Sequence, residues 1–146
     1  MKTNTHGLPE SIIRAIDNDN YSGPKGQELH IGVTTLIGPP KIHFLKIRHA
    51  AEIVEDYSDM LWALFGKLGH HLLEASGCKN KIQEPRMEEE IDGVTVSGQM
   101  DLIDEVEISD YKFTSTWTYI FNPTGKKEWV EQLNVYKWLA RHLFDI

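Results

Sequence analysis

Several features that mark other classes of protein are scarce or missing in this sequence of 146 residues. Cys78 is the one cysteine, which excludes an internal disulfide framework and a cysteine-ligated zinc or iron–sulfur site within one chain. No apolar run approaches the ~20 residues of a membrane-spanning helix, and the polar start, MKTNTHGLPE, lacks the apolar region of a signal peptide. We therefore expect a cytoplasmic protein with no membrane partner.

Positive charge is also scarce, since 22 acidic residues face 15 lysines and arginines and the net charge is −7. A protein that binds nucleic acid mainly through phosphates is usually basic, so this balance argues mildly against DNA binding. Local patches and bound divalent cations can reverse the sign of a site, however, and clustered carboxylates are what such cations require. The net charge therefore leaves DNA binding open.

The length suits a single domain over residues 1–146, and the composition, 40% hydrophobic and 25% charged, is ordinary for a soluble globular protein. We divide the domain into an N-terminal extension, 1–45, and a core, 50–146. In the extension we expect a short helix at 10–17, then a loop. The segment IGVTTLIGPP, residues 31–40, then predicts a short strand or extended piece that stops at its prolines.

The core predicts a helix, three strands and a second helix. Apolar residues at helical spacing indicate the first helix between about residues 50 and 75, with Ser58 as its N-cap and Gly77 as its stop. The strands are RMEEEI, VTVSGQMDLI and VEISDYKFTS, joined by a hairpin turn at Asp92-Gly93 and a second turn near Asp104-Glu105. The closing amphipathic helix is KKEWVEQLNVYKWLARHLF. This order predicts an α+β fold, a central mixed sheet with a three-stranded meander flanked by helices.

Acidic residues interrupt these strands at positions that share one face. Residues two apart in a strand point the same way, so Asp110 and Lys112 share a face and Tyr111 points oppositely, toward whatever packs behind. The second turn would bring Asp101 close to Asp110, and two carboxylates can bind a hard divalent cation. Lys112 beside that cation can orient or help deprotonate a water, or stabilise charge on a phosphate. Alone, an Asp-x-Lys triplet is more often a surface ion pair.

Three further positions, one histidine and two glutamates, are candidate ligands. On the first helix, Trp62, Gly66, His70 and Glu74 form one stripe, and Gly66 would let the helix approach the sheet so that His70 reaches the cation. A lone histidine there is more often a polar edge or a satisfied core residue, and His71 should face elsewhere. Glu88 and Glu90 lie near Asp101 and Asp110 in sequence, and Glu90 is the candidate for one more acidic residue at the metal site. A glutamate at such a position is, however, more often a solvated strand residue.

The closing helix carries one polar pair. Gln132 and Tyr136 lie four residues apart and share a helix face. Their amide and phenol can bond to a phosphate or to a strand end, or they can rim the core beside Trp129 and Leu133.

Taken in order, four motifs between about residues 60 and 140 resemble the PD-(D/E)XK nuclease superfamily, in particular its RecB-like branch. They are Gly66-x-x-x-His70, Gly98-x-x-Asp101, Asp110-x-Lys112 and Gln132-x-x-x-Tyr136. The resemblance implies a restriction-endonuclease-like fold that binds Mg²⁺ or Mn²⁺ through His70, Asp101, Asp110 and the backbone carbonyl of Tyr111. It implies Lys112 as the catalytic lysine, with Gln132 and Tyr136 supporting the site near DNA.

The same resemblance implies metal-assisted hydrolysis of DNA phosphodiester bonds. The setting would be phage-type replication, recombination or repair in a bacterial or phage-infected cell, and an exonuclease is the expected form. The four cysteines of the CRISPR-associated subgroup are missing, so no iron–sulfur cluster is expected. No P-loop Gly-Lys-Ser/Thr occurs, so any helicase motor would sit on another polypeptide, and a helicase or recombination protein is a candidate partner.

One departure and two rival hypotheses remain. The family core usually continues with a strand after the Gln-x-x-x-Tyr helix, so this chain is a minimal form, a shortened one, or one completed by another segment such as VTTLI. The first rival is a catalytically inactive DNA-binding or scaffold module that retains the nuclease fold. The second is an unrelated acidic interaction domain with a chance pattern.

Overall fold

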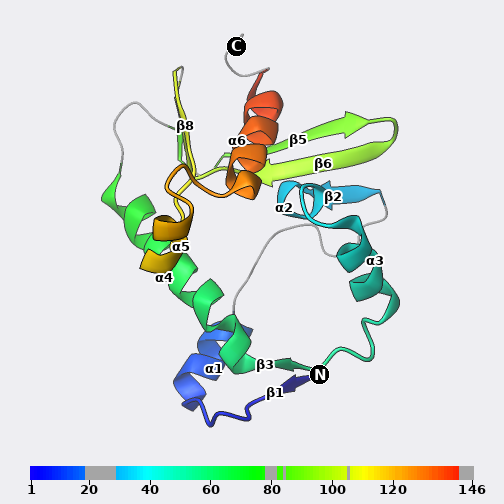
Figure 1. Ribbon diagram of the computed structural model, residues 1–146, viewed down its shortest axis with the longest axis vertical. Helices are drawn as coiled ribbons and strands as arrows, with labels where there is room; N and C mark the ends of the chain where they lie inside the picture. Colours follow the sequence, from blue (N-terminus) through cyan, green and yellow to red (C-terminus); the bar gives the residue numbers. More distant parts are fainter. Residues whose placement is uncertain (19–28, 78–81, 84, 105, 142–146) are drawn as a thin grey trace.

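The computed structural model describes residues 1–18, 29–77, 82–83, 85–104 and 106–141 and has an α+β fold (Figure 1). Its elements, in chain order, are β1 (Lys2–Thr3), α1 (Glu10–Asp17), β2 (His30–Gly32), α2 (Val33–Leu36), α3 (Pro40–Arg48), β3 (Glu55–Asp56), the 3₁₀ helix η1 (Tyr57–Met60), α4 (Leu61–Ser76), β4 (Ile82–Gln83), β5 (Arg86–Ile91), β6 (Val94–Gln99), β7 (Leu102–Ile103), β8 (Ile108–Ser109), α5 (Thr116–Phe121) and α6 (Lys127–Ala140). Among the described helices, none is long and apolar enough to span a bilayer.

The strands form three small sheets in the described part of the chain. One has the order β2-β6-β5, with β2 parallel to β6 and β5 antiparallel to it. A second has the order β4-β7-β8 and is antiparallel, and the third pairs β1 with β3. The β5–β6 hairpin turns at Asp92 and Gly93, whose φ angles are 50° and 80°. Positive φ at both positions is what a tight hairpin turn requires, so the predicted turn is confirmed.

The expected three-stranded meander is divided between two of these sheets. The segment VTVSGQMDLI breaks after Gln99, so β6 stays with β5 while β7 pairs with β8 and β4. VEISDYKFTS is a strand only at Ile108–Ser109. The early end of β8 has a local cause, because the Asp101 carboxylate accepts a hydrogen bond from the backbone amide of Tyr111, just past the paired residues. A side chain that takes a backbone donor in this way competes with the sheet ladder.

The N-terminal extension contributes to the core. As predicted, α1 spans Glu10–Asp17, and residues 30–32 form a strand, β2, which adds to β6. The rest of IGVTTLIGPP differs from the prediction, since Val33–Leu36 is a helical turn and Pro40 begins α3 instead of ending a strand. Proline suits a first helical position because its φ is already helical and its missing N–H would have no intrahelical partner.

The first core helix, α4, begins at Leu61, later than predicted, because residues 55–60 form β3 and η1. The turn that leads into α4 is capped by Asp56 rather than by Ser58. The Asp56 carboxylate accepts hydrogen bonds from the Ser58 amide at 3.0 Å and from the Thr5 amide at 2.8 Å. These backbone hydrogen bonds hold the pKa of Asp56 far below its ordinary value. Gly77 ends α4 as predicted, with φ 66°. Residues 142–144 of the predicted closing helix lie outside the described residues.

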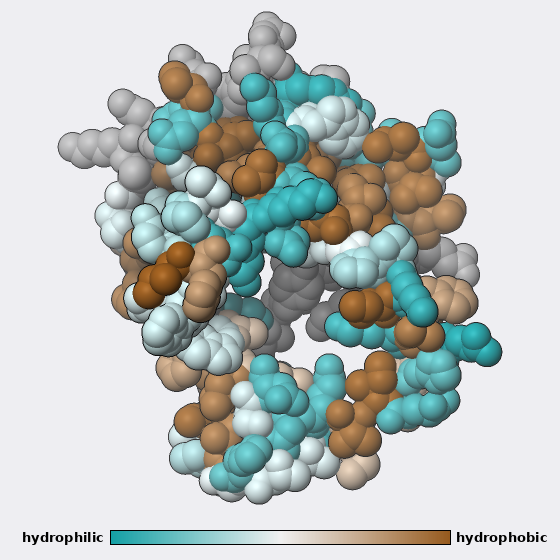
Figure 2. Space-filling view, viewed as in Figure 1, coloured by the Kyte–Doolittle hydropathy of each residue, from teal (hydrophilic) through white to brown (hydrophobic). Residues whose placement is uncertain are grey.

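The hydrophobic core lies where α6 packs on β5, β6 and β8, with α2 beside it (Figure 1). Its buried side chains are Val33, Met87, Val96, Met100, Ile103, Tyr136, Leu139 and Ala140. By contrast, none of the residues of α4, all of which the structure describes, is buried. Figure 2 shows hydrophobic side chains reaching the surface in several places on this face. It also shows a hollow between the upper part, which carries β5, β6 and α6, and the lower part, which carries β1 and β3.

Candidate active site

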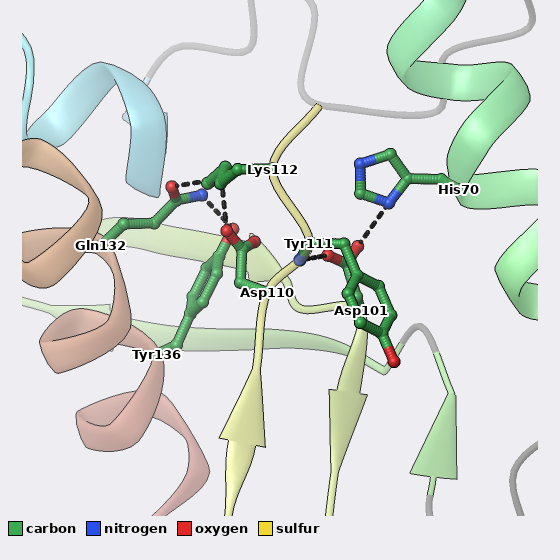
Figure 3. A network of polar contacts seen from close by, with 7 residues as sticks. All are labelled: His70, Asp101, Asp110, Tyr111, Lys112, Gln132 and Tyr136. Atoms are coloured by element: carbon green, nitrogen blue, oxygen red, sulfur yellow. Dashed lines mark hydrogen bonds and ion pairs between the residues drawn. The ribbon is translucent and has the colours of Figure 1, made fainter. Parts of the chain in front are cut away.

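The two carboxylates of the predicted site come together at the ends of β7 and β8. Leu102 pairs with Ser109 and Ile103 with Ile108, so continuing the register places Asp101 opposite Asp110. Both acids lie just past the paired residues, and the Tyr111 amide that donates to Asp101 lies between them (Figure 3). The expectation that the turn brings Asp101 close to Asp110 is confirmed.

His70 joins this pair from α4. Its Nδ1 lies 2.9 Å from Asp101 Oδ1, and its ring meets the Phe113 ring edge to face at a centroid distance of 5.5 Å. The prediction that the close approach occurs at Gly66 is wrong. Apart from its chain neighbours and the backbone of its own helix, no described atom lies within 4 Å of a Cβ built there. The close contact is at Gly69, where a Cβ would fall 2.1 Å from Phe113 Cζ. His71 points away as expected, 79% exposed and 3.7 Å from Glu74.

A second set of contacts runs from Asp110 to α6. Lys112 forms an ion pair with Asp110 and donates from Nζ to Gln132 Oε1 at 2.9 Å. Gln132 Nε2 in turn donates to the Tyr136 hydroxyl at 2.7 Å (Figure 3). Gln132 and Tyr136 are buried, and so is the Asp110 side chain at 8% exposure. Gly98 makes room for this arrangement, since a Cβ there would lie 2.6 Å from Tyr136 Cε1.

Tyr111 departs from one expectation. Its side chain points away from those of Asp110 and Lys112, as the strand alternation predicts (Figure 3). However, it is 36% exposed and does not pack into the core behind the strand. The reason is that β8 ends at Ser109, so Tyr111 lies in an irregular segment without a sheet face to cover.

The electrostatics of the site centre on Asp101. Burial raises the pKa of the Asp101 carboxyl above its ordinary value of 3.8, and the charge of Asp110 raises it further. The Tyr111 amide, His70 and Lys112 act against this shift. Two carboxylates held this close repel each other, and a positive ion placed between them would relieve that repulsion.

The donor set fits a hard divalent cation in its chemistry, because it combines two carboxylates, a backbone carbonyl and one imidazole. As arranged, the groups are not gathered around one point, since among the described residues no three histidine, cysteine or acidic side chains are placed to hold a metal ion. The Asp110 carboxylate is paired with Lys112, so a cation would compete with Lys112 for that carboxylate.

The extra acids considered from the sequence lie elsewhere. Glu88 Oε1 is 4.0 Å from His30 Nε2, and Glu90 is an exposed residue of β5 paired with Thr95. Arg86, four residues before Glu90, pairs with Gln99, so Glu90 lies about 13 Å along the strand from the end that leads to Asp101. Neither glutamate belongs to the site, because the hairpin carries both away from it.

Two residues that contact the site were missed by the sequence reasoning, Gly69 and Phe113. Gly69 directly precedes His70, and Phe113 directly follows Lys112. The sequence offered one signal for each residue. Gly69 is a small residue next to the candidate ligand His70, and Phe113 is an aromatic residue next to the candidate catalytic Lys112. Helical stripes alone favoured Gly66, which has the i−4 spacing but faces no neighbour in the described residues.

Known proteins offer no match: comparison of the chain finds no protein-family model, no curated protein and no solved structure that matches it.

Proposed function

We propose that this protein is a Mg²⁺- or Mn²⁺-dependent deoxyribonuclease of the PD-(D/E)XK type, RecB-like branch, that hydrolyses DNA phosphodiester bonds in phage-type replication, recombination or repair. The proposal rests on one observation. Side chains from four motifs, spread over sixty-seven sequence positions from His70 to Tyr136, meet in two sets of polar contacts on either side of the Tyr111 backbone. A chance pattern of residues has no reason to converge in this way.

The geometry supports distinct roles for the two sets. His70 and Asp101 lie within 2.9 Å of each other and, with Asp110 and the Tyr111 carbonyl, are the groups that would hold the cation. A bound Mg²⁺ or Mn²⁺ supplies Lewis-acid stabilisation of charge on the phosphate. Its binding would also release Asp110 from Lys112, because the cation takes the place of the ammonium as the partner of that carboxylate.

Lys112 is then available to the substrate. In hydrolysis a water oxygen forms a bond to phosphorus and gives up one proton to solvent, the bond from phosphorus to the leaving oxygen breaks, and the leaving oxygen gains a proton from solvent. The Lys112 ammonium can donate to the attacking water or to a non-bridging phosphate oxygen as negative charge grows there. Gln132 accepts from Lys112 Nζ and is fixed by Tyr136, so this buried pair positions the lysine.

The second candidate function is a catalytically inactive DNA-binding or scaffold module. One observation favours it: Asp110 is satisfied by Lys112, and the described residues do not enclose a ready metal site. In that case the ion pair would be a structural element, and the fold would bind DNA without cleaving it.

The deciding experiment incubates the protein with linear and circular DNA, single- and double-stranded, in Mg²⁺, Mn²⁺ or EDTA. Cleavage that requires the metal supports a nuclease, and cleavage limited to linear DNA supports an exonuclease. Binding of DNA without cleavage under every condition would support the inactive module.

A matched pair of variants guards this experiment against a contaminating nuclease. His70→Ala removes a proposed ligand and should abolish cleavage, whereas His71→Ala removes the neighbouring histidine, 79% exposed, and should leave cleavage unchanged. Equal loss in both variants, or in neither, would contradict the assignment of His70.

A further inference from the structure

One stretch beside the candidate site has an unusual composition. In a chain with 22 acidic residues, none occurs between Asp110 and Glu128. The same stretch, 111–127, holds three lysines and five aromatic residues; we call it the aromatic segment. The aromatic residues are Tyr111, Phe113, Trp117, Tyr119 and Phe121. Aromatic rings flanked by positive charge suit a nucleic acid strand, which offers flat bases and phosphates.

The rings of this segment lie on the surface. Trp117 is 66% exposed, Tyr119 68% and Phe121 75%. Trp117 and Phe121 are four residues apart on α5 and stack with ring centroids 6.0 Å apart and planes inclined by 23°. Large aromatic side chains exposed together in this way usually mark an interaction site, because burial would otherwise be more favourable.

The aromatic segment is continuous with the candidate active site. Phe113 follows Lys112 and lies against His70 and Gly69 of α4. Trp117 is five residues beyond Lys112, so their Cα atoms are at most about 18 Å apart even in a fully extended chain. A strand bound on α5 is therefore within a few nucleotides of the groups proposed to cut it.

A second acid-free stretch, 29–51, gives a useful contrast. It carries exposed apolar side chains on α3, but these are mostly aliphatic, and Phe44 is its single aromatic residue. Figure 1 shows α3 on the opposite side of the molecule from α5. Of these two stretches, only the aromatic segment combines several exposed aromatic rings and lysines with a ring, Phe113, that lies against His70.

We propose that the aromatic segment binds single-stranded DNA, stacking unpaired bases on Trp117 and Phe121 and leading the strand to Lys112. This inference rests on the proposed nuclease function and adds its substrate class. Bases of a duplex are already stacked on one another, whereas unpaired bases can stack on a protein ring whatever their sequence. Lys126 and Lys127 add positive charge for the phosphates at the end of the segment, with Lys127 in an exposed ion pair with Glu131 at 3.1 Å.

The test measures binding in EDTA with three labelled DNA probes of about 12 nucleotides, within the span of known single-strand sites. The probes are a single strand, an abasic single strand with the same number of phosphates, and a blunt duplex. Fluorescence anisotropy should show the single strand bound most tightly. Abasic DNA bound as tightly as the normal strand would overturn the inference, because phosphates alone would then explain the binding.

Variants locate the binding surface. Trp117→Leu and Phe121→Leu should each weaken single-strand binding by about 5- to 150-fold, the range for loss of one stacked base, and leave the abasic probe unaffected. Trp117→Phe, which keeps a ring, should retain most of the affinity. Phe44→Leu is the matched control, an exposed phenylalanine on α3, outside the aromatic segment, and should bind like the wild type. Thermal melting checks that all four variants are folded.

Two results would separate this inference from the proposed function. Metal-dependent cleavage with unchanged binding by Trp117→Leu and Phe121→Leu would refute the aromatic segment and leave the nuclease standing. Base-dependent binding that these variants lose, without cleavage by the wild type, would refute the nuclease and leave the segment standing. If light scattering instead shows that the variants dissociate a self-associated wild type without changing its DNA binding, the segment is an interface between copies, and the inference is overturned.

Discussion

Gly98 should be intolerant of a side chain, and the size of the effect follows from its surroundings. In Gly98→Ala the new Cβ would lie 2.6 Å from Tyr136 Cε1 and 2.9 Å from Val33 Cγ2, both closer than carbon atoms approach. Tyr136 and Val33 are 4% and 2% exposed, so neither can move into solvent. Overpacking of this kind costs about 2–3 kcal/mol, the upper part of the usual range. Alanine recovers about 0.5–1 kcal/mol of backbone entropy relative to glycine.

The net loss, about 1–2.5 kcal/mol, corresponds to a melting temperature lower by about 2–10 °C for a chain of this size. Gly66→Ala is the internal control, since the position is inside α4 and, apart from its chain neighbours and the backbone of that helix, no described atom lies within 4 Å of its Cβ. Removing a helical glycine there should stabilise the protein by about 0.5–1 kcal/mol and raise the melting temperature by about 1–4 °C. Thermal denaturation of both variants by circular dichroism makes the comparison. If Gly98→Ala melts at or above the wild type, the packing of α6 on β6 described above is incorrect. If Gly66→Ala melts well below it, the open surroundings of Gly66 on α4 are incorrect.

Two further predictions concern the charges of the site. The pKa of Asp101 is raised from 3.8, so its charged form destabilises the fold as the pH rises through the raised value, whereas below 3.8 the folded and unfolded states are both protonated. In EDTA, Asp101→Asn should therefore melt above the wild type at about pH 7 and lose that advantage by about pH 3; an advantage that grows on acidification would contradict the sign. Asp110→Ala should abolish Mn²⁺ binding in isothermal titration, while Lys112→Ala should retain or tighten it, because the competing ammonium is removed from Asp110. Equal Mn²⁺ affinity of Asp110→Ala and the wild type would exclude Asp110 as a ligand.

The sequence was sufficient where a local signal and a tertiary contact agree. Asp92-Gly93 has the residues that tolerate positive φ, and the β5–β6 hairpin follows from them. Gln132 and Tyr136 share a helix face by spacing alone, and the structure adds that they bond to each other. The pairing of Asp101 with Asp110 follows from counting residues on either side of the turn.

The sequence was insufficient where polar side chains compete with the backbone. Asp101 takes the Tyr111 amide, which ends a strand that the β-branched pattern would extend. The Asp56 carboxylate accepts a hydrogen bond from the Ser58 amide and caps η1, the turn before α4. The sequence pattern favoured Ser58 itself as the cap. Ser115 accepts from the Thr118 amide and begins α5, a helix too short to show a hydrophobic period. Which polar group reaches which amide depends on the folded geometry, and composition does not encode it.

Gly66 and Gly69 illustrate the same limit in packing. Both glycines lie on α4, and both leave a helix surface without a side chain. Only the position of Phe113, 44 residues after Gly69, decides that the close approach occurs at Gly69. Helical spacing shows which residues share a face of a helix. It does not show which of those faces a distant segment of the chain will pack against.

The most direct test of the proposed nuclease is the single-turnover cleavage rate of Lys112→Ala in Mn²⁺, with the metal saturating. Lys112 contacts both Asp110 and Gln132, and its proposed work falls on the chemical step rather than on metal binding. Removing it should slow cleavage by about a hundredfold or more, as for other groups that move a proton or stabilise charge in a transition state. A variant that cuts DNA at the wild-type rate would make Lys112 a structural ion-pair partner and contradict the central assignment.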